Sequence, residues 1–511
     1  MIVIKYLILL MFGMVMSVQT ALAEGIDEKI ERYFAPFSDK FSEIIFSPVN
    51  IYGNDIPLLI FLIILTSIFC TIYFRGLSIW GFKHAITKIF GKKKAGEKEG
   101  SGEVSTLGAL ATALSGTIGI GNIAGVAIAI SVGGPGAMFW MCLGAFFGMV
   151  IKFCEVTLAL RYRHFNRDGS VSGGPMYYIE RGFALRKYHA LGKTLSYIFA
   201  LALIPGTIGG GCLLQTNQAL EQFINITGGE NSFFAANSWV FGLAVAIFVG
   251  LVIVGGIKSI ANVTSKVVPS MCLIYAGACI IIIAMNITHI PQAIYTIFHE
   301  AFFPQAVYGG IAGTVIIGLR RSLQSNEAGI GSSPIAYAAV KTDEPASQGF
   351  VSMIEPFFDT VVVCSMTAFV IILTGEYTNY TSGITGVELT SAAFKSVLPF
   401  FPYILAVVII LFALSTILSW AYYGQKAWAF LVGEGKKRSM LFNLFLCFFV
   451  IVGSCMNIKS VIDFTDATYM VMASTNLIAI CVLLRDVKKE LVKYCKKHNL
   501  INIINKSWFK E

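Results

Sequence analysis

The sequence predicts an all-helical membrane protein of about eleven spans, in which one extra N-terminal helix precedes two sets of five helices running in opposite directions. Three observations support this fold class. The chain of 511 residues is 56% hydrophobic and only 13% charged, which excludes a soluble enzyme. Several apolar runs reach the roughly 20 residues that cross a bilayer. Two glycine-rich, polar segments also occupy matching places in the two sets.

The first 23 residues have the pattern of a cleavable secretory signal peptide. Lys5 precedes an apolar core, and the small residues Ala21 and Ala23 form a cleavage site before Glu24. An uncleaved anchor helix is the alternative. Residues 24–55 are then expected to be a polar, amphipathic stretch outside the cytoplasm.

The apolar runs define the expected spans and domains. The extra helix lies near 56–76, and a basic cytoplasmic loop continues to residue 103. The first set of five covers 104–287, with spans near 104–131, 135–163, 193–222, 236–257 and 262–287. The second set covers 307–485, with spans near 307–340, 349–374, 399–430, 439–457 and 463–485. Residues 486–511 form a basic cytoplasmic tail.

The basic residues predict the orientation of these spans. If the mature N-terminus lies outside and the spans alternate, 29 of the 38 Lys and Arg residues fall on the inside and only 5 fall outside. This asymmetry is the positive-inside pattern of membrane proteins, so the net charge of +9 does not indicate nucleic acid. We therefore expect an integral protein of a bacterial inner (plasma) membrane, with a cytoplasmic C-terminus.

The two glycine-rich segments indicate where a site would lie. The first set opens with SGTIGIGN at residues 115–122, and the second opens with SNEAGIGSSP at residues 325–334. Because five is odd, the second set must be inverted relative to the first, provided that both fold alike. Transporters of this design bind substrate and ions near the midplane, at broken helices. The sequence therefore predicts a secondary transporter.

Other function classes lack their usual motifs. The eleven cysteines are scattered without a CxxC pair, which indicates neither a metal site nor disulfides. No HExxH or GxSxG motif occurs, and the histidines lie in predicted loops or helix ends, which disfavours a membrane-embedded enzyme. An ion channel would normally have a filter loop or rings of charge, and we find neither pattern. No cofactor is expected.

The combined motifs resemble those of the alanine or glycine:cation symporter family. The matching segments are GIGNIAGVAIAISVGGPGAMFW (119–140), KFCEVTLALRYR (152–163), GGPMYYI (173–179), SNEAGIG (325–331), FALSTILSWAYYG (412–424) and residues 463–480. The resemblance implies an all-α polytopic membrane protein with a LeuT-like 5+5 inverted repeat. It also implies sodium-coupled symport of a small neutral amino acid, alanine or glycine, by alternating access. Proton coupling or another amino acid remains the alternative, and the oligomeric state is not indicated.

Sodium prefers oxygen ligands, and the first break can supply them. Unwinding near Gly119 would free backbone carbonyls around Ser115, Thr117 and Ile118. Asn122 adds a side-chain oxygen, which by resemblance serves a cation site beside the substrate.

By resemblance, two hydroxyls on the span near 399–430 complete a second sodium site. These are Thr416 and its partner Ser415. The alternative is that such hydroxyls bond back to their own helix.

Several further residues are candidates for the substrate site. The resemblance directs the amides from Gly119 to Gly121 toward the substrate carboxylate, with Thr117 nearby. Gln215 lies in the apolar middle of a span, where an unpaired amide is costly. The remaining candidates are Ser325 at the second break and Trp420, one turn after Thr416. The alternatives are glycine-mediated helix packing, an interhelical tie and a core tryptophan.

Charged residues inside spans are expected to form structural or gating ion pairs. Lys152, Glu155, Arg320, Arg321 and Glu327 form this group. Glu327 is expected to pair with one of the arginines or with Lys152, and Lys152 is also within reach of Glu155 on one helix face.

Two more features concern the second set. Asp463 and Asp466 are interpreted as the cap of the last span. Gln324 replaces a phenylalanine that is common in relatives, so a polar group there would rewet or enlarge the pocket.

Overall fold

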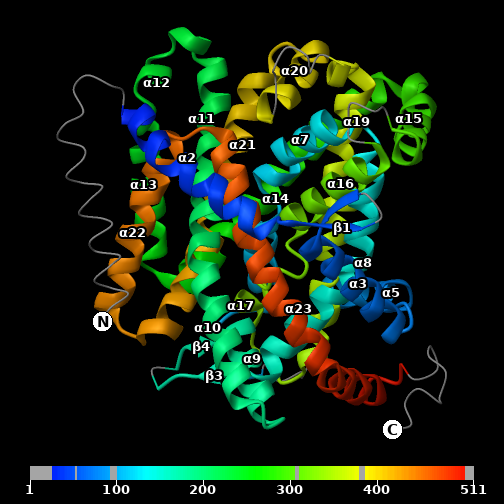
Figure 1. The fold of residues 1–511 in the computed structure, drawn as a ribbon, viewed down its shortest axis with the longest axis vertical. Helices are drawn as coiled ribbons and strands as arrows, with labels where there is room; N and C mark the ends of the chain where they lie inside the picture. Colours follow the sequence, from blue (N-terminus) through cyan, green and yellow to red (C-terminus); the bar gives the residue numbers. More distant parts are fainter. Residues whose placement is uncertain are drawn as a thin grey trace.

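The computed structural model describes residues 26–51, 54–91, 100–167, 169–304, 310–378 and 386–500. The predicted signal peptide and the end of the basic tail therefore lie outside the described residues. The described chain forms a bundle of helices (Figure 1), with two short antiparallel strand pairs, β1–β2 and β3–β4, at its periphery.

The elements up to residue 304 include helices in the first six predicted spans and shorter elements between and beside them. They are α2 (Ile26–Ile45), β1 (Pro48–Ile51), β2 (Asn54–Pro57), α3 (Leu58–Tyr73), α4 (Leu77–Trp80), α5 (Phe82–Phe90), α6 (Thr106–Thr117), η1 (Ile120–Asn122), α7 (Ala124–Gly133), α8 (Ala137–Arg161), β3 (His164–Phe165), β4 (Val171–Ser172), α9 (Pro175–Ala184), α10 (His189–Gly206), η2 (Thr207–Leu213), α11 (Leu214–Ile226), η3 (Gly229–Asn231), α12 (Phe233–Ala236), α13 (Ser238–Ile253), α14 (Gly256–Met285), η4 (Ile287–His289) and α15 (Ile290–Phe302).

The elements after residue 309 form the second group. They are α16 (Gly310–Asn326), α17 (Pro334–Tyr337), α18 (Pro345–Ser352), η6 (Phe357–Cys364), α19 (Ser365–Thr374), α20 (Val387–Val397), α21 (Phe401–Val432), α22 (Lys436–Ser454) and α23 (Ile458–Lys497). Three elements of the described chain are not α-helices or strands but matter for the site: η1 is a 3₁₀ turn, and η2 and η6 are π-helical.

Each of the eleven predicted span ranges contains helix in the structure. By length and composition, seven helical runs of the described chain could cross a membrane, and two bent helix pairs would raise this number to nine. The other two ranges hold α13, which is apolar but has 16 residues, and α16, which has 17 residues and contains two arginines.

The predicted break near Gly119 is present. The run from α6 into η1 and α7 bends by 54°, and Gly119 lies between the helices in an extended conformation. The helix at the second glycine-rich segment also breaks off. It stops at Asn326, the end of α16, and Gly329 and Gly331 follow with φ of +95° and +85°. Gly331 needs to be glycine on two counts, because a Cβ there would also lie 2.6 Å from Cγ of Pro175.

The two breaks lie against each other in the interior of the bundle. Nδ2 of Asn122 is 3.3 Å from Oγ of Ser325, and a Cβ at Gly121 would lie 3.6 Å from Cα of Ser325. In Figure 1 the surrounding frame includes α8, α10, α16, α21 and the long helix α23.

The start of α23 corrects one prediction. The helix begins at Ile458, and the side chain of Asn457 caps it by accepting a hydrogen bond from the amide of Lys459 at 2.9 Å. Asp466 therefore lies about two turns inside the helix and is 2% exposed. The cap interpretation of Asp463 and Asp466 is wrong because the helix starts earlier than the apolar run.

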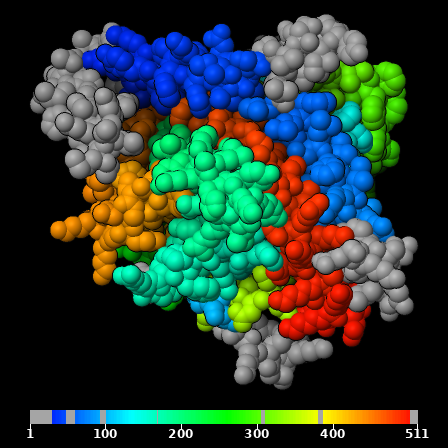
Figure 2. Space-filling model, turned by 60° about the horizontal axis from the view of Figure 1, so that its bottom comes forward, coloured from blue at the N-terminus to red at the C-terminus, as the bar shows by residue number. Residues whose placement is uncertain are grey.

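The predicted amphipathic stretch before the first span contains α2, which lies along the surface of α23. Phe34, Phe37 and Phe41 of α2 surround the ring of Phe464 at 5.1 to 6.2 Å, and the Ser38 hydroxyl donates to a backbone carbonyl of α23 at 2.7 Å. Figure 2 shows α2 as a dark-blue band across one end of the molecule. Part of its apolar face thus packs against α23, while the side chain of Phe37 remains 57% exposed.

Candidate functional site

The break after α6 is held open by side chains. The amide of Gly119 donates to Oδ1 of Asn122 at 2.9 Å, so the side chain of Asn122 replaces a helical carbonyl. The next amide, of Ile120, donates to Oε1 of Gln215 at 3.4 Å. Gln215 in turn donates to the carbonyl of Gly210 at 2.9 Å. Two of the predicted polar residues therefore bond directly to the unwound backbone.

The hydroxyls of α21 approach the same break from the other side. Thr416 donates to the carbonyl of Ser115 at 3.0 Å, and the Ser115 hydroxyl donates to the carbonyl of Ser415 at 2.5 Å. The hydroxyl of Ser415 instead bonds back to Phe412 of its own helix at 3.0 Å, which is the alternative that the sequence left open. Ser419, which the sequence analysis did not single out, also bonds to the Ser115 hydroxyl, at 3.0 Å.

A buried carboxylate joins the two breaks. Asp359, on η6, is fully buried and accepts hydrogen bonds from Nδ2 of Asn122 at 2.7 Å and from the Ser325 hydroxyl at 2.5 Å. Thr360 adds a third bond at 2.9 Å. Asp359 is not among the predicted site residues, although an acidic residue inside a predicted span is a signal for function.

A small cavity lies beside the break. Its volume is about 260 Å³ with its opening included, and its lining residues are Gly116, Thr117, Gly119, Gly121, Gly210, Leu214, Gln215, Gln324, Glu327, Trp420 and Tyr469. The rings of Trp420 and Tyr469 stack at 5.1 Å with 8° between their planes. A Cβ at Gly210 would overlap Oη of Tyr469, so the π-helical turn η2 must carry glycine there to admit this ring.

Most of the predicted site residues meet around this cavity. Thr117, Gly119, Gly121, Gln215 and Trp420 line it. Asn122 and Ser325 lie directly behind it, in contact with each other and with Asp359. Ser115, Ser415 and Thr416 form the contact between α6 and α21, and Ile118 is the C-cap residue that follows α6.

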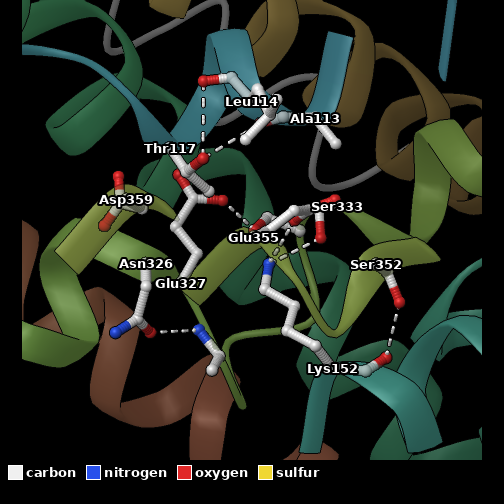
Figure 3. Close-up of polar contacts among 12 residues, drawn as sticks. Ala113, Leu114, Thr117, Lys152, Asn326, Glu327, Ser333, Ser352, Glu355 and Asp359 are labelled. Atoms are coloured by element: carbon white, nitrogen blue, oxygen red, sulfur yellow. Dashed lines mark hydrogen bonds and ion pairs between the residues drawn. The ribbon is translucent and has the colours of Figure 1, made fainter. Parts of the chain in front are cut away.

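The charged residues pair differently from the prediction. Lys152, fully buried on α8, donates to the Ser333 hydroxyl at 2.6 Å and lies 3.4 Å from Oε2 of Glu355 (Figure 3). Glu155 accepts hydrogen bonds from Asn476 at 2.5 Å and from the amide of Gly329 at 3.1 Å. Neither carboxylate partner of Lys152 that the sequence suggested, Glu155 or Glu327, pairs with it within 4 Å.

The arginines of α16 pair with the last helix. Nε of Arg320 lies 2.8 Å from Oδ2 of Asp466, and Arg321 bonds to the same oxygen and to Gln324. The predicted pairing of Glu327 with an arginine is therefore wrong. The correct partner, Asp466, is distant in sequence and lies on α23, where a single sequence gives no sign of contact.

The chain is similar to known membrane transporters. A model of the sodium:alanine symporter family matches residues 39–504. A sodium/alanine symporter, AgcS, of Methanococcus maripaludis is 39% identical over 430 residues, which are 84% of this chain and 92% of that protein. A probable sodium/glutamine symporter, GlnT, of Bacillus subtilis is 31% identical, covering 87% of this chain and 90% of its own.

A solved structure is also similar. MhsT in complex with L-phenylalanine aligns with a TM-score of 0.41 and 15% identity, over 76% of this chain and 92% of its own. The relatives are membrane transporters rather than enzymes, and sodium is the co-transported ion that the family description names. Since the family model spans most of the chain, the protein is an integral membrane transporter and belongs to the sodium:alanine symporter family.

Proposed function

We propose that the protein is a sodium-coupled symporter that carries a small neutral amino acid, alanine or glycine, into the cell by alternating access. The proposed topology has eleven spans, with the mature N-terminus outside and the C-terminus in the cytoplasm of a bacterial inner membrane. Residues 104–287 and 307–485 form the two inverted repeats, and their broken first helices hold the substrate and the ions.

The observation that supports this most strongly is the meeting of both helix breaks at one cavity. Oxygen atoms surround the first break on two sides. Thr416 and the carbonyl of Ser115 lie 3.0 Å apart on one side, and Asn122, Ser325 and Asp359 cluster on the other. These are the oxygen donors that a hard monovalent cation prefers. We place one sodium ion at each side of the break.

Coupling follows if ion and substrate stabilise each other's bound state, which is a reciprocal free energy. The unwound backbone from Gly119 to Gly121 contributes to the cavity wall, and its amides bond to Asn122 and Gln215. An ion that fixes Asn122 therefore also fixes the cavity wall. The substrate carboxylate is expected at this backbone segment.

The preferred amino acid depends on the cavity wall, to which Gln324 contributes. This polar side chain lines the cavity and accepts a hydrogen bond from Arg321. A glutamine at this wall leaves room and a polar surface that a phenylalanine would remove. Serine and glutamine therefore belong in the substrate panel beside alanine and glycine.

Uptake by reconstituted vesicles tests the proposal. Vesicles with an inward sodium gradient should accumulate labelled alanine or glycine in a saturable manner, and replacing sodium with choline should abolish the accumulation. A proton gradient applied without sodium distinguishes proton coupling. Accumulation that does not depend on sodium would refute sodium coupling, and absence of uptake for every amino acid in the panel would refute the substrate class.

A further inference from the structure

The carboxylate of Glu327 lines the cavity without a cationic partner. Glu327 is 2% exposed and, in Figure 3, extends from the end of α16 toward Thr117. The buried cations of the described chain are used elsewhere, because Lys152 pairs with Glu355, Arg321 pairs with Asp466, and Lys426 donates to the hydroxyl of Ser172. No Lys, Arg or His nitrogen of the described residues forms an ion pair with Glu327.

Its hydrogen bonds come from neutral donors. The indole Nε1 of Trp420 donates to Oε1 at 2.9 Å, and the hydroxyl of Ser332 donates to Oε2. An ionised carboxylate has about four acceptor positions, so about half of them stay open. The two bonds fix both oxygens in place but do not neutralise the charge. A buried charge inside a membrane protein usually has a partner.

The backbone also holds this side chain at the cavity. Glu327 has φ of +56°, a left-handed conformation that residues other than glycine, asparagine and aspartate rarely adopt. Such residues cluster at functional sites. Its amide still bonds to Leu323 at 3.0 Å, so the strained residue is the last one held by α16. The turn directs the carboxylate back toward the break in the first helix.

Two other buried carboxylates lack an ion pair within the described chain, and their positions separate them from Glu327. Asp359 and Glu155 do not line the cavity. Asp359 has three donors on its two oxygens, and Glu155 bonds to Asn476 and Gly329 away from the cavity. Glu327 is the carboxylate that a molecule in the cavity can reach.

We propose that Glu327 binds the α-ammonium group of the transported amino acid, with Trp420 and Ser332 orienting its two oxygens. The inference rests on the proposed function and extends it, because it assigns the positive end of the substrate to the second break and leaves the negative end to the backbone at Gly119 to Gly121. The charge that the buried carboxylate lacks is then supplied by the substrate itself. Compounds without an ammonium group should be rejected.

Binding measurements on the purified full-length protein test this assignment. The variants are Glu327→Gln, Glu327→Asp and, as a matched control, Glu155→Gln, which neutralises a buried carboxylate outside the cavity lining. We expect E327Q to weaken alanine binding at saturating sodium by about tenfold or more, because it removes a charge-assisted hydrogen bond. Binding of ²²Na⁺ without amino acid should be unchanged. E155Q should change alanine binding less than about threefold.

The substrate side gives a second, independent arm. L-lactate carries a hydroxyl where alanine carries its ammonium group, so the wild type should bind alanine far more tightly than lactate. E327Q should narrow this preference by about tenfold, and E327D, which keeps the charge, should retain most of it. Because both affinities are measured on the same variant, their ratio still tests the role of Glu327 if E327Q lowers the stability of the protein.

Three results would overturn the inference. The first is an unchanged alanine affinity in E327Q. The second is a loss of ²²Na⁺ binding in parallel with the loss of alanine binding, which would make Glu327 an ion ligand. The third is a preference for alanine over lactate that is as large in E327Q as in the wild type. Each of these differs from a failure of the proposed function, which would appear as absence of sodium-driven amino-acid uptake in the wild type.

Discussion

Replacing Asp466 with asparagine should be among the most destabilising single changes in the helix bundle. Its carboxylate lies between Arg320 and Arg321, and Arg321 and Asp466 are only 3% and 2% exposed. Arg320 is 19% exposed and its guanidinium lies 4.1 Å from the ring centre of Phe46. The neutral amide of the D466N variant would leave two adjacent positive groups without a counter-charge, one of them fully desolvated.

The size of the effect follows from this burial. Removing one partner of a buried ion pair costs about 3–5 kcal/mol, because the other charge remains buried and unpaired. An exposed pair would cost about 1 kcal/mol or less. In the double variant R321Q/D466N only the more exposed Arg320 remains, so part of the stability should return. The difference between the double variant and the sum of the single variants measures the coupling.

Thermal unfolding of the purified protein is the assay, with Asp463→Asn as the control. Asp463 is only half-buried and makes no ion pair within 4 Å among the described residues, so the same change of charge there should alter stability by about 0.5 kcal/mol or less. D466N should unfold several degrees below both D463N and the wild type. If D466N and D463N unfold at the same temperature, the assignment of a stabilising buried triad is wrong.

Three further predictions concern the site and the end of α23. Thr416→Ala should raise the sodium concentration for half-maximal uptake about fivefold or more, whereas Thr416→Ser should not. Gly119→Ala should impair sodium-driven uptake, because its Cβ would lie 2.5 Å from the Thr416 hydroxyl, while Gly121→Ala has 3.6 Å of clearance and should keep ²²Na⁺ binding. Burial raises the pKa of Glu344 and its ion pair with Lys497 at 2.6 Å lowers it, with the net pKa below the ordinary 4.5. The contact therefore stabilises the end of α23 above about pH 4.5 and is lost at lower pH, so hydrogen exchange near residue 497 should be faster in Glu344→Gln at pH 7 and equal to the wild type in strong acid.

Sequence reasoning located the helices and the first break because both depend on local chemistry. Apolar runs set the helix positions, and a cluster of glycines with one amide marks backbone that does not stay helical. The same reasoning selects Gln215, since polar groups inside apolar spans need partners, whereas Thr416 follows from the family resemblance. In the structure Gln215 bonds to the unwound segment at Ile120, and Thr416 bonds to the carbonyl of Ser115 in the last turn of α6.

Partner identities could not be derived in the same way. Arg321 and Asp466 both stand out in the sequence, but they are 145 residues apart, and nothing local in either segment specifies the other. The sequence predicts Asp466 to be part of the cap of the last span, because the apolar run starts later than the helix itself. Asp359 is a different case, because an acidic residue inside a predicted span indicates a functional site even when its partners are unknown.

The amphipathic helix α2 shows a further limit of reading one segment at a time. Its pattern predicts a polar, amphipathic stretch, but part of its apolar face packs on α23 more than 400 residues later, where Ser38 bonds to the carbonyl of Ser460. The family model begins at residue 39, so most of α2 lies outside the residues that this model matches. Phe46, just after α2, reaches Arg320 and so connects this segment to the buried triad.

The positions of the buried charges explain how one cavity could select both a zwitterion and an ion. Asp359 and Asn122 form a polar cluster behind the first break, where a bound cation would be enclosed by oxygens. Glu327 lines the cavity itself, where its charge has no ion-pair partner among the described residues. If an ion occupied Asp359 and the amino-acid ammonium occupied Glu327, each bound species would neutralise one carboxylate. In the empty transporter, by contrast, neither carboxylate has a positive partner in the part of the chain that the structure describes. The free energy of filling both sites would therefore be available for coupling.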